Sequence, residues 1–91
     1  MGQSDYDYPN PFNPTTTIQY GIVKEGLVTL TIYNILGQEV RTLVNTSQNG
    51  GVYKVVWNGL DNHNRIVPNG IYIYRIISDN FVKSKKMVFL K

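Results

Sequence analysis

Residues 57–76 read Trp-Asn-Gly-Leu-Asp-Asn-His-Asn-Arg-Ile-Val-Pro-Asn-Gly-Ile-Tyr-Ile-Tyr-Arg-Ile. A β-branched and aromatic run at residues 51–57 leads into this stretch, and a second run at residues 71–77 begins within it. Both have the composition of β-strands. Between the runs, Asn, Asp, Gly and Pro occur too densely for a helix or a strand. The stretch therefore predicts a strand, a long ordered loop and a second strand, with the single tryptophan as a core anchor.

The composition extends this prediction to the whole chain. Its 91 residues suit one domain and include no alanine, ten valines, nine isoleucines and seven tyrosines. Because alanine favours helices and β-branched residues favour strands, we expect an all-β domain. The absence of cysteine excludes disulfides and thiolate metal sites. No apolar run approaches the ~20 residues of a membrane span.

Alternating apolar residues predict further strands at residues 15–22, 27–33, 38–45 and 81–91. Turn residues separate them, and we expect Ile35 and Leu36 to be tucked inward at the turn before Gly37. Asp79 and Asn80 form the two-residue turn of a final hairpin. About seven antiparallel strands at this spacing predict a β-sandwich of two sheets of three or four strands. The predicted core comprises Ile18, Tyr20, Val28, Leu30, Ile32, Val55, Trp57, Tyr72, Tyr74 and Ile76.

The inward face of the last strand is ambiguous. Val82, Val88 and Leu90 share one parity, whereas Met87 and Phe89 share the other. A β-bulge near the lysines at 85 and 86 would place both sets inward.

The N-terminal segment 6–14 holds three of the four prolines. Proline restricts itself and its predecessor to extended geometry, so we expect an extended arm that packs on the domain through Tyr8 and Phe12. An SH3-type ligand is the alternative, but the usual basic residues are missing. Residues 1–7 are interpreted as a linker or vector-derived start, and residues 8–91 as the domain.

The inventory of reactive groups argues against an enzyme. A nucleophile–base pair needs an oriented base, and the one histidine, His63, lies in the middle of the predicted loop. No phosphate-binding glycine motif is present. We therefore expect no catalytic residues and no cofactor.

The loop 61–65 resembles a calcium-binding loop only superficially. An EF-hand needs oxygen ligands at positions one, three and five, where this chain has Asp61, His63 and Arg65. We expect no metal, although a looser calcium site using Asp61, Asn62 and Asn64 stays open. The simpler interpretation is that Asp61 and Asn64 bond their own loop backbone.

Basic and aromatic residues outside the loop suggest two further kinds of binding surface. Lys54, Arg75 and Lys83 are too few and too dispersed to predict a nucleic-acid partner. A carbohydrate-binding or adhesive module would use exposed aromatics, for which Tyr6, Tyr8 and Tyr33 are candidates.

The positive charge concentrates near the C-terminus. After Asp79 come Lys83, Lys85, Lys86 and Lys91 with no acidic residue. The lysines either contact a partner, for example through strand addition to the last strand, or protect an exposed sheet edge from aggregation.

Four blocks in order carry a family resemblance. The first is Tyr-Pro-Asn-Pro-Phe-Asn-Pro-Thr-Thr-Thr-Ile-Gln-Tyr (8–20), and the second runs over 28–43. The third comprises Trp-Asn-Gly-Leu-Asp (57–61) and Val-Pro-Asn-Gly-Ile-Tyr-Ile-Tyr-Arg (67–75), and the last is Lys-Lys-Met-Val-Phe-Leu-Lys (85–91). The chain resembles the C-terminal sorting domains of the bacterial type IX secretion system. Its third block is shared with the immunoglobulin-like domain of flagellar hook-capping proteins.

This resemblance implies an immunoglobulin-like β-sandwich that directs an N-terminal cargo domain through the periplasm and across the outer membrane. The implied partners are the outer-membrane translocon and a sortase-like peptidase that removes the domain. The cargo would then be secreted or attached to the cell surface. The residues we expect the translocon to read are Lys85, Lys86, Met87, Val88, Phe89, Leu90 and Lys91.

Overall fold

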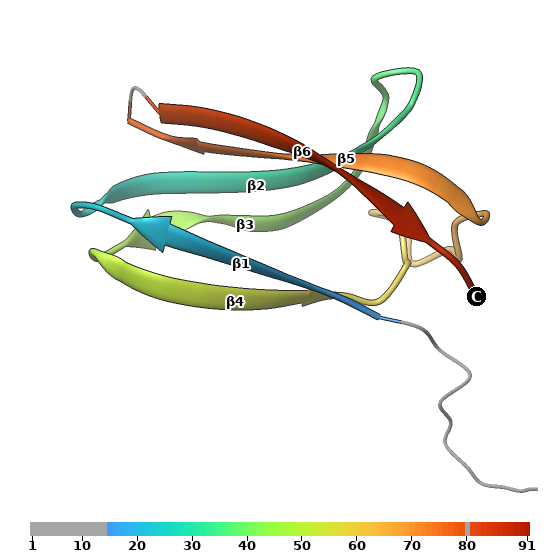
Figure 1. The fold of residues 1–91 in the computed structure, drawn as a ribbon, viewed down its shortest axis with the longest axis horizontal. Coiled ribbons are helices and arrows are strands. Elements are labelled where there is room, and N and C mark those ends of the chain that lie inside the picture. Colours follow the sequence, from blue (N-terminus) through green and yellow to red (C-terminus); the bar gives the residue numbers. More distant parts are fainter. Residues whose placement is uncertain (1–14, 80) are drawn as a thin grey trace, which may run out of the picture.

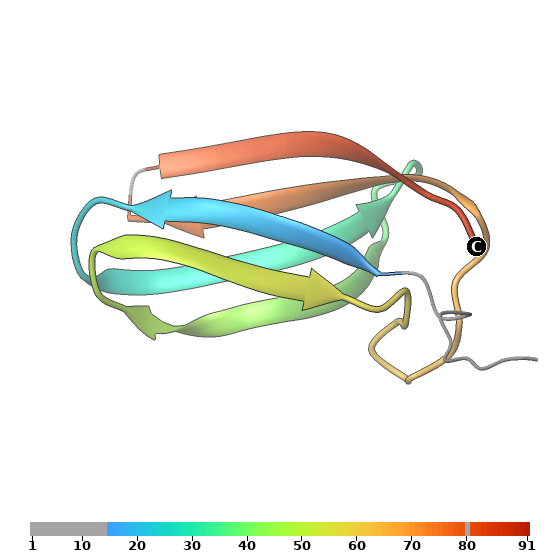
Figure 2. The same ribbon diagram turned by 60° about the horizontal axis from the view of Figure 1, so that its bottom comes forward.

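The computed structural model describes residues 15–79 and 81–91, which form six strands. They are β1 (Thr16–Ile22), β2 (Gly26–Asn34), β3 (Glu39–Gln48), β4 (Gly51–Trp57), β5 (Gly70–Ser78) and β6 (Phe81–Phe89). β1 pairs with β4, and the other strands form a four-stranded sheet in the order β3-β2-β5-β6. Figures 1 and 2 show the two sheets as separate layers.

This arrangement confirms the predicted all-β immunoglobulin-like sandwich with antiparallel pairing. The described part contains six strands where about seven were predicted, and the sheets divide two to four. The predicted arm at residues 6–14, with Tyr8 and Phe12, and the domain boundary at residue 8 lie outside the described residues. Within the described ranges, no helix has the length and apolarity to cross a membrane.

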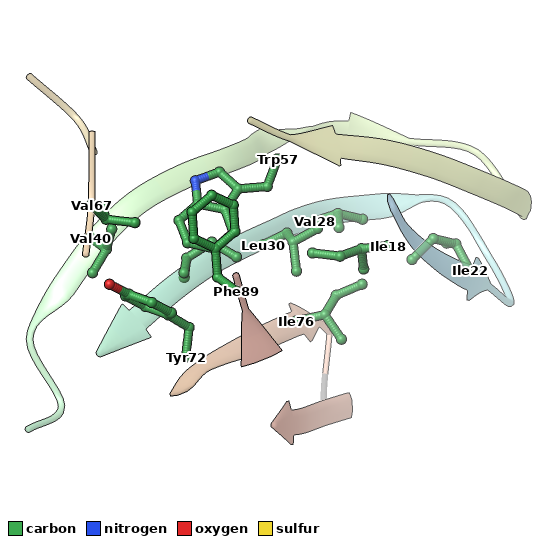
Figure 3. Close-up of a cluster of buried hydrophobic side chains, with 11 residues drawn as sticks. Ile18, Ile22, Val28, Leu30, Val40, Trp57, Val67, Tyr72, Ile76 and Phe89 are labelled. Atoms are coloured by element: carbon green, nitrogen blue, oxygen red, sulfur yellow. The ribbon is translucent and has the colours of Figure 1, made fainter. Parts of the chain in front are cut away.

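One hydrophobic core lies between the two sheets (Figure 3). Seven of the ten predicted core side chains are buried, and Tyr20, Val55 and Tyr74 pack half-buried against them. The core also includes Ile22, Val40, Val67 and Phe89, which the predicted set left out. Alternation along each strand therefore identified most of the core, and Ile22 continues the alternation of β1. Val67, by contrast, lies in the β4–β5 loop, outside any strand.

The pair Tyr20 and Tyr53 ties β1 to β4. The two residues are direct cross-strand partners, and their rings stack with centroids 5.5 Å apart. The Tyr20 hydroxyl donates to Gln48 Oε1 at 2.9 Å, and Gln48 belongs to the other sheet. This side chain thus contributes both to pairing within one layer and to contact between layers.

Two local predictions were wrong at the β2–β3 hairpin. Ile35 and Leu36 are 69% and 78% exposed, because the turn extends beyond the sandwich (Figure 1). Asn34 closes this turn by accepting hydrogen bonds at Oδ1 from the amides of Leu36 and Gln38. In addition, β3 continues to Gln48 rather than ending near residue 45, since its last residues pair with the start of β2.

The bulge predicted in the last strand is also absent. β6 pairs with β5 in an unbroken register from Ser78↔Phe81 to Gly70↔Phe89. The register shifts occur instead between β2 and β3. Met87 and Phe89 face inward, and Val88 is 58% exposed.

The packing of Phe89 against Gly59 determines which face of β6 points inward. Gly59 has a φ of 77°, and a Cβ added to it would overlap the Phe89 ring. The ring of Phe89 therefore occupies the space that any other residue at position 59 would fill. The sequence Trp-Asn-Gly and the last strand form a single packing unit.

Gly59→Ala tests this unit. The left-handed φ alone should cost about 1–2 kcal/mol, and overlap with a buried ring should add about 1–3 kcal/mol. Gly37→Ala is the matched control, because Gly37 has a φ of 81° but nothing within 4 Å of its added Cβ. Urea unfolding should show a clearly larger loss for Gly59→Ala. Equal losses for the two variants would show that Phe89 does not fill the space at Gly59.

Candidate functional site

The predicted recognition segment lies along β6 and the two residues after it, at an edge of the four-stranded sheet (Figure 1). Of its seven residues, five are exposed, Met87 is half-buried and Phe89 is 2% exposed. Lys85, Lys86, Val88, Leu90 and Lys91 are therefore accessible to a partner, whereas Phe89 belongs to the core of the folded domain.

Phe89 is held in an aromatic cluster. Its ring centroid lies 5.0 Å from that of Trp57 and 6.4 Å from that of Tyr72, with the second contact edge-on. Figure 3 shows the three rings together at one end of the core. Such contacts stabilise beyond the area that they bury. The C-terminal end of β6 is consequently fixed to both sheets.

The loop between β4 and β5 satisfies the polar atoms of this cluster. Trp57 Nε1 donates to the Leu60 carbonyl at 3.0 Å, and the Tyr72 hydroxyl donates to the Pro68 carbonyl at 2.7 Å. Burial raises the pKa of Tyr72. A buried indole or phenol without such partners would be destabilising, so the carbonyl groups of the loop help to stabilise the core.

The same loop also holds Lys91, the second residue after β6. Asn69 Oδ1 accepts a hydrogen bond from the Lys91 amide at 2.9 Å. Besides the pairing of β5 with β6, the third sequence block therefore contacts the closing block through Gly59 and through Asn69. These contacts fix the direction in which the chain leaves the sandwich.

The lysines of β6 divide between its two faces. Lys83 and Lys85 lie opposite Ile76 and Tyr74 on the face that Phe89 shares, whereas Lys86 lies opposite Ile73 on the outer face. All three are exposed. Among residues 15–79 and 81–91, the ion pair found joins Arg65 and Asp61, so none of these lysines has a carboxylate partner there.

The candidate calcium loop is closed by its own hydrogen bonds. Asp61 Oδ1 accepts from the amides of His63 and Arg65 at 2.8 and 2.9 Å, and Oδ2 accepts from Arg65 Nε. The carbonyl-type oxygens of Asn62 and Asn64 accept from the Thr42 amide and from Arg41. His63 is exposed. Each candidate ligand side chain thus already has a protein donor, and the described residues contain no group of three or more His, Cys, Asp or Glu suited to a metal.

These bonds give the loop a second role as a cover for β3. The Asn62 amide donates to the Val40 carbonyl at 2.8 Å, and its side chain accepts from the Thr42 amide. Arg41 donates to the Asp61 carbonyl at 2.7 Å. The loop therefore occupies part of the outer edge of β3, as an added strand would.

Asp61 should make this loop sensitive to acid. The Arg65 amide is the main cause that lowers the pKa of Asp61, followed among the favourable contacts by the His63 amide. Because the folded-state pKa is depressed, the loop's stabilisation is present above the ordinary value of 3.8 and is lost as pH falls through the lower folded value. NMR titration of the His63 and Arg65 amide shifts should give a midpoint below 3.8. Asp61→Asn should remove the transition, and calcium should leave both the shifts and the melting temperature unchanged.

A midpoint at or above the ordinary value would show that the carboxylate does not accept these amides. A calcium-dependent rise in melting temperature that Asp61→Asn abolishes would establish the looser calcium site instead.

The strand residues weighed as nucleic-acid or carbohydrate contacts do not form one surface. Lys54 lies in the two-stranded sheet, while Arg75 and Lys83 lie on opposite faces of the other sheet. The Arg75 guanidinium lies 5.3 Å from the centroid of Tyr33, so this half-buried ring is covered. The other aromatic candidates, Tyr6 and Tyr8, lie outside the described residues.

The chain was compared with known proteins. The family of the FlgD Ig-like domain matches residues 21–80. Among solved structures, that of FlgD from P. aeruginosa superposes with a TM-score of 0.65 at 21% identity. The superposition covers 82% of this chain and 58% of that chain, so this chain spans little more than half of that FlgD's length. No curated protein matches the chain significantly. The structural likeness supports the same sandwich fold, and the family match covers more than half of the sequence: the chain belongs to the FlgD Ig-like domain family.

Proposed function

We propose that this FlgD-like Ig domain is a C-terminal sorting domain that directs an attached cargo protein across the bacterial outer membrane by the type IX secretion system. The observation that carries the proposal is the basic closing block displayed on β6, together with the four ordered sequence blocks. A sorting signal needs a stable shape and an accessible segment rather than a reaction centre. The exposed Lys85, Lys86 and Lys91 supply such a segment.

The packing of Phe89 supports this role in a specific way. It makes the closing block a rigid part of the folded domain instead of a loose tail. Ordering a flexible segment on binding costs conformational entropy, and a pre-ordered strand avoids much of that cost. The translocon would therefore recognise the folded domain and its exposed lysines together.

The two ends of the described domain lie close together. Thr16, at the start of β1, pairs with Trp57, whose ring contacts Phe89 near the end of β6. A cargo domain attached before β1 would thus join at the end of the sandwich where the basic segment leaves. This proximity suits a machine that reads the segment and a sortase-like peptidase that cleaves ahead of the domain, releasing cargo into the medium or onto the cell surface.

Membership in the FlgD Ig-like domain family alone does not select this function, because the third sequence block is shared between sorting domains and flagellar hook-capping proteins. A carbohydrate-binding or adhesive module is the alternative function. No specific observation favours it, since Arg75 covers the candidate Tyr33 platform.

Charge reversal at the closing block tests the proposal. A folded periplasm-directed reporter fused ahead of residues 8–91 should be exported by a type IX-competent host. Reversing the three exposed lysines with Lys85→Glu, Lys86→Glu and Lys91→Glu should block export, because the translocon loses its charged contacts. Exposed substitutions usually change stability by about 0.5 kcal/mol or less, so the melting curve should hardly move.

Lys24→Glu with Lys54→Glu is the control, since both lysines are exposed and lie outside β6. This variant should be exported normally. Export of the folded triple variant would refute recognition by charge, and lack of export of the unchanged domain would refute the sorting function itself. Deleting residues 85–91 is unsuitable as a test, because it also removes Phe89 from the core.

A further inference from the structure

The two edges of the four-stranded sheet are protected differently. β3 carries two register shifts against β2, and the Asn62 loop bonds to its outer side. β6 has neither device: it pairs with β5 over nine residues without a shift, and no described segment pairs with its other side. A long, regular and uncovered edge offers a row of free backbone donors and acceptors. β6 is thus the edge of this sheet that can accept another strand.

Positively charged side chains protect the β6 edge from pairing with a second copy of itself. Lys83, Lys85 and Lys86 are exposed, and within the described ranges none has a carboxylate partner. Pairing two copies of β6 would bring lysines together, which is unfavourable between adjacent strands. An acidic strand would instead gain from the same charges. The edge therefore excludes a second copy of itself and suits a strand of opposite charge.

We propose that β6 binds an extended acidic segment of a partner protein by strand addition. Because Lys83 and Lys85 share one face, their partner residues are two apart and share a face as well. Lys86 calls for an acid on the other face, where Val82 and Val88 favour apolar neighbours. In antiparallel pairing, a fitting sequence is Val-Thr-Glu-Glu-Thr-Glu-Val, set opposite residues 88 to 82.

This inference deepens the export proposal, because it names the chemistry of the partner that the same strand would meet. The two can fail separately. Strand addition is measured on the purified domain and requires no secretion machinery. Failed binding with intact export would refute strand addition alone, while failed export with intact binding would refute the export role alone.

The test is an NMR titration of the labelled 91-residue chain with synthetic peptides. The acidic peptide should shift the β6 signals and slow exchange of its outward amides by about tenfold or more, as new backbone hydrogen bonds form. A peptide with lysine in place of each glutamate should not bind. A peptide with both threonines replaced by proline keeps the charge but cannot pair as a strand, and it should leave amide exchange unchanged.

Charge exchange provides the matched control. The variant Lys83→Glu with Lys85→Glu should lose the acidic peptide and bind the lysine peptide, whereas Lys24→Glu with Lys54→Glu should behave as the unchanged domain. If the proline peptide bound as well as the acidic peptide, strand addition would be refuted, and the binding would be due to attraction between charges alone. Unaffected β6 amides would overturn the site. Self-association that protects β6 without peptide would show that the occupant is a second copy.

Discussion

The contact between Phe89 and Gly59 is the constraint on which the rest of the structure depends. It joins the last strand to the loop after β4, so it connects the two sheets as well as distant parts of the chain. Burying a phenylalanine side chain contributes about 1.5–3 kcal/mol, and a small domain has a net stability of only about 5–15 kcal/mol. The left-handed φ at Gly59 and the wall formed by Trp57 create the space, and the ring sets the register and inward face of β6.

This constraint also separates the closing block into a structural part and a free part. Phe89 is buried, and the Lys91 amide is bound by Asn69. Lys85 shares the inward face with Phe89 but remains exposed, because among residues 15–79 and 81–91 the opposite layer consists of the two strands β1 and β4 (Figure 2). The fold thus holds a basic strand in one defined position while leaving its charges open to a partner.

Local sequence patterns were sufficient to identify the buried residues of strands that have a single apolar face. Ile18, Leu30 and Ile76 were identified by alternation, and the antiparallel sandwich followed from the spacing of the turns. Alternation was not sufficient in β6, whose two faces both carry apolar residues. The deciding fact was that Gly59, 30 residues earlier in the chain, has no side chain and so leaves space for the Phe89 ring, which no pattern within β6 indicates.

Other residues missed from the sequence have similar non-local causes. Val40 and Val67 are buried because the β4–β5 loop folds over the edge of β3, with the Val67 amide donating to the Gly59 carbonyl. Ile35 and Leu36 show the converse, since apolar residues at a turn that projects past the sandwich have nothing to pack against. For the candidate site, the sequence located the basic segment and the structure showed which of its side chains are accessible.

Native-state hydrogen exchange tests most directly whether Phe89 fixes β6. The amides of β6 that bond to β5 should exchange with the same free energy of opening as those between β2 and β5, because the strand cannot leave while its ring is in the core. In Phe89→Ala, the β6 amides alone should open at lower free energy. If β6 of the unchanged domain already opens about 3 kcal/mol or more below global unfolding, the last strand is not held by this contact and the account is contradicted.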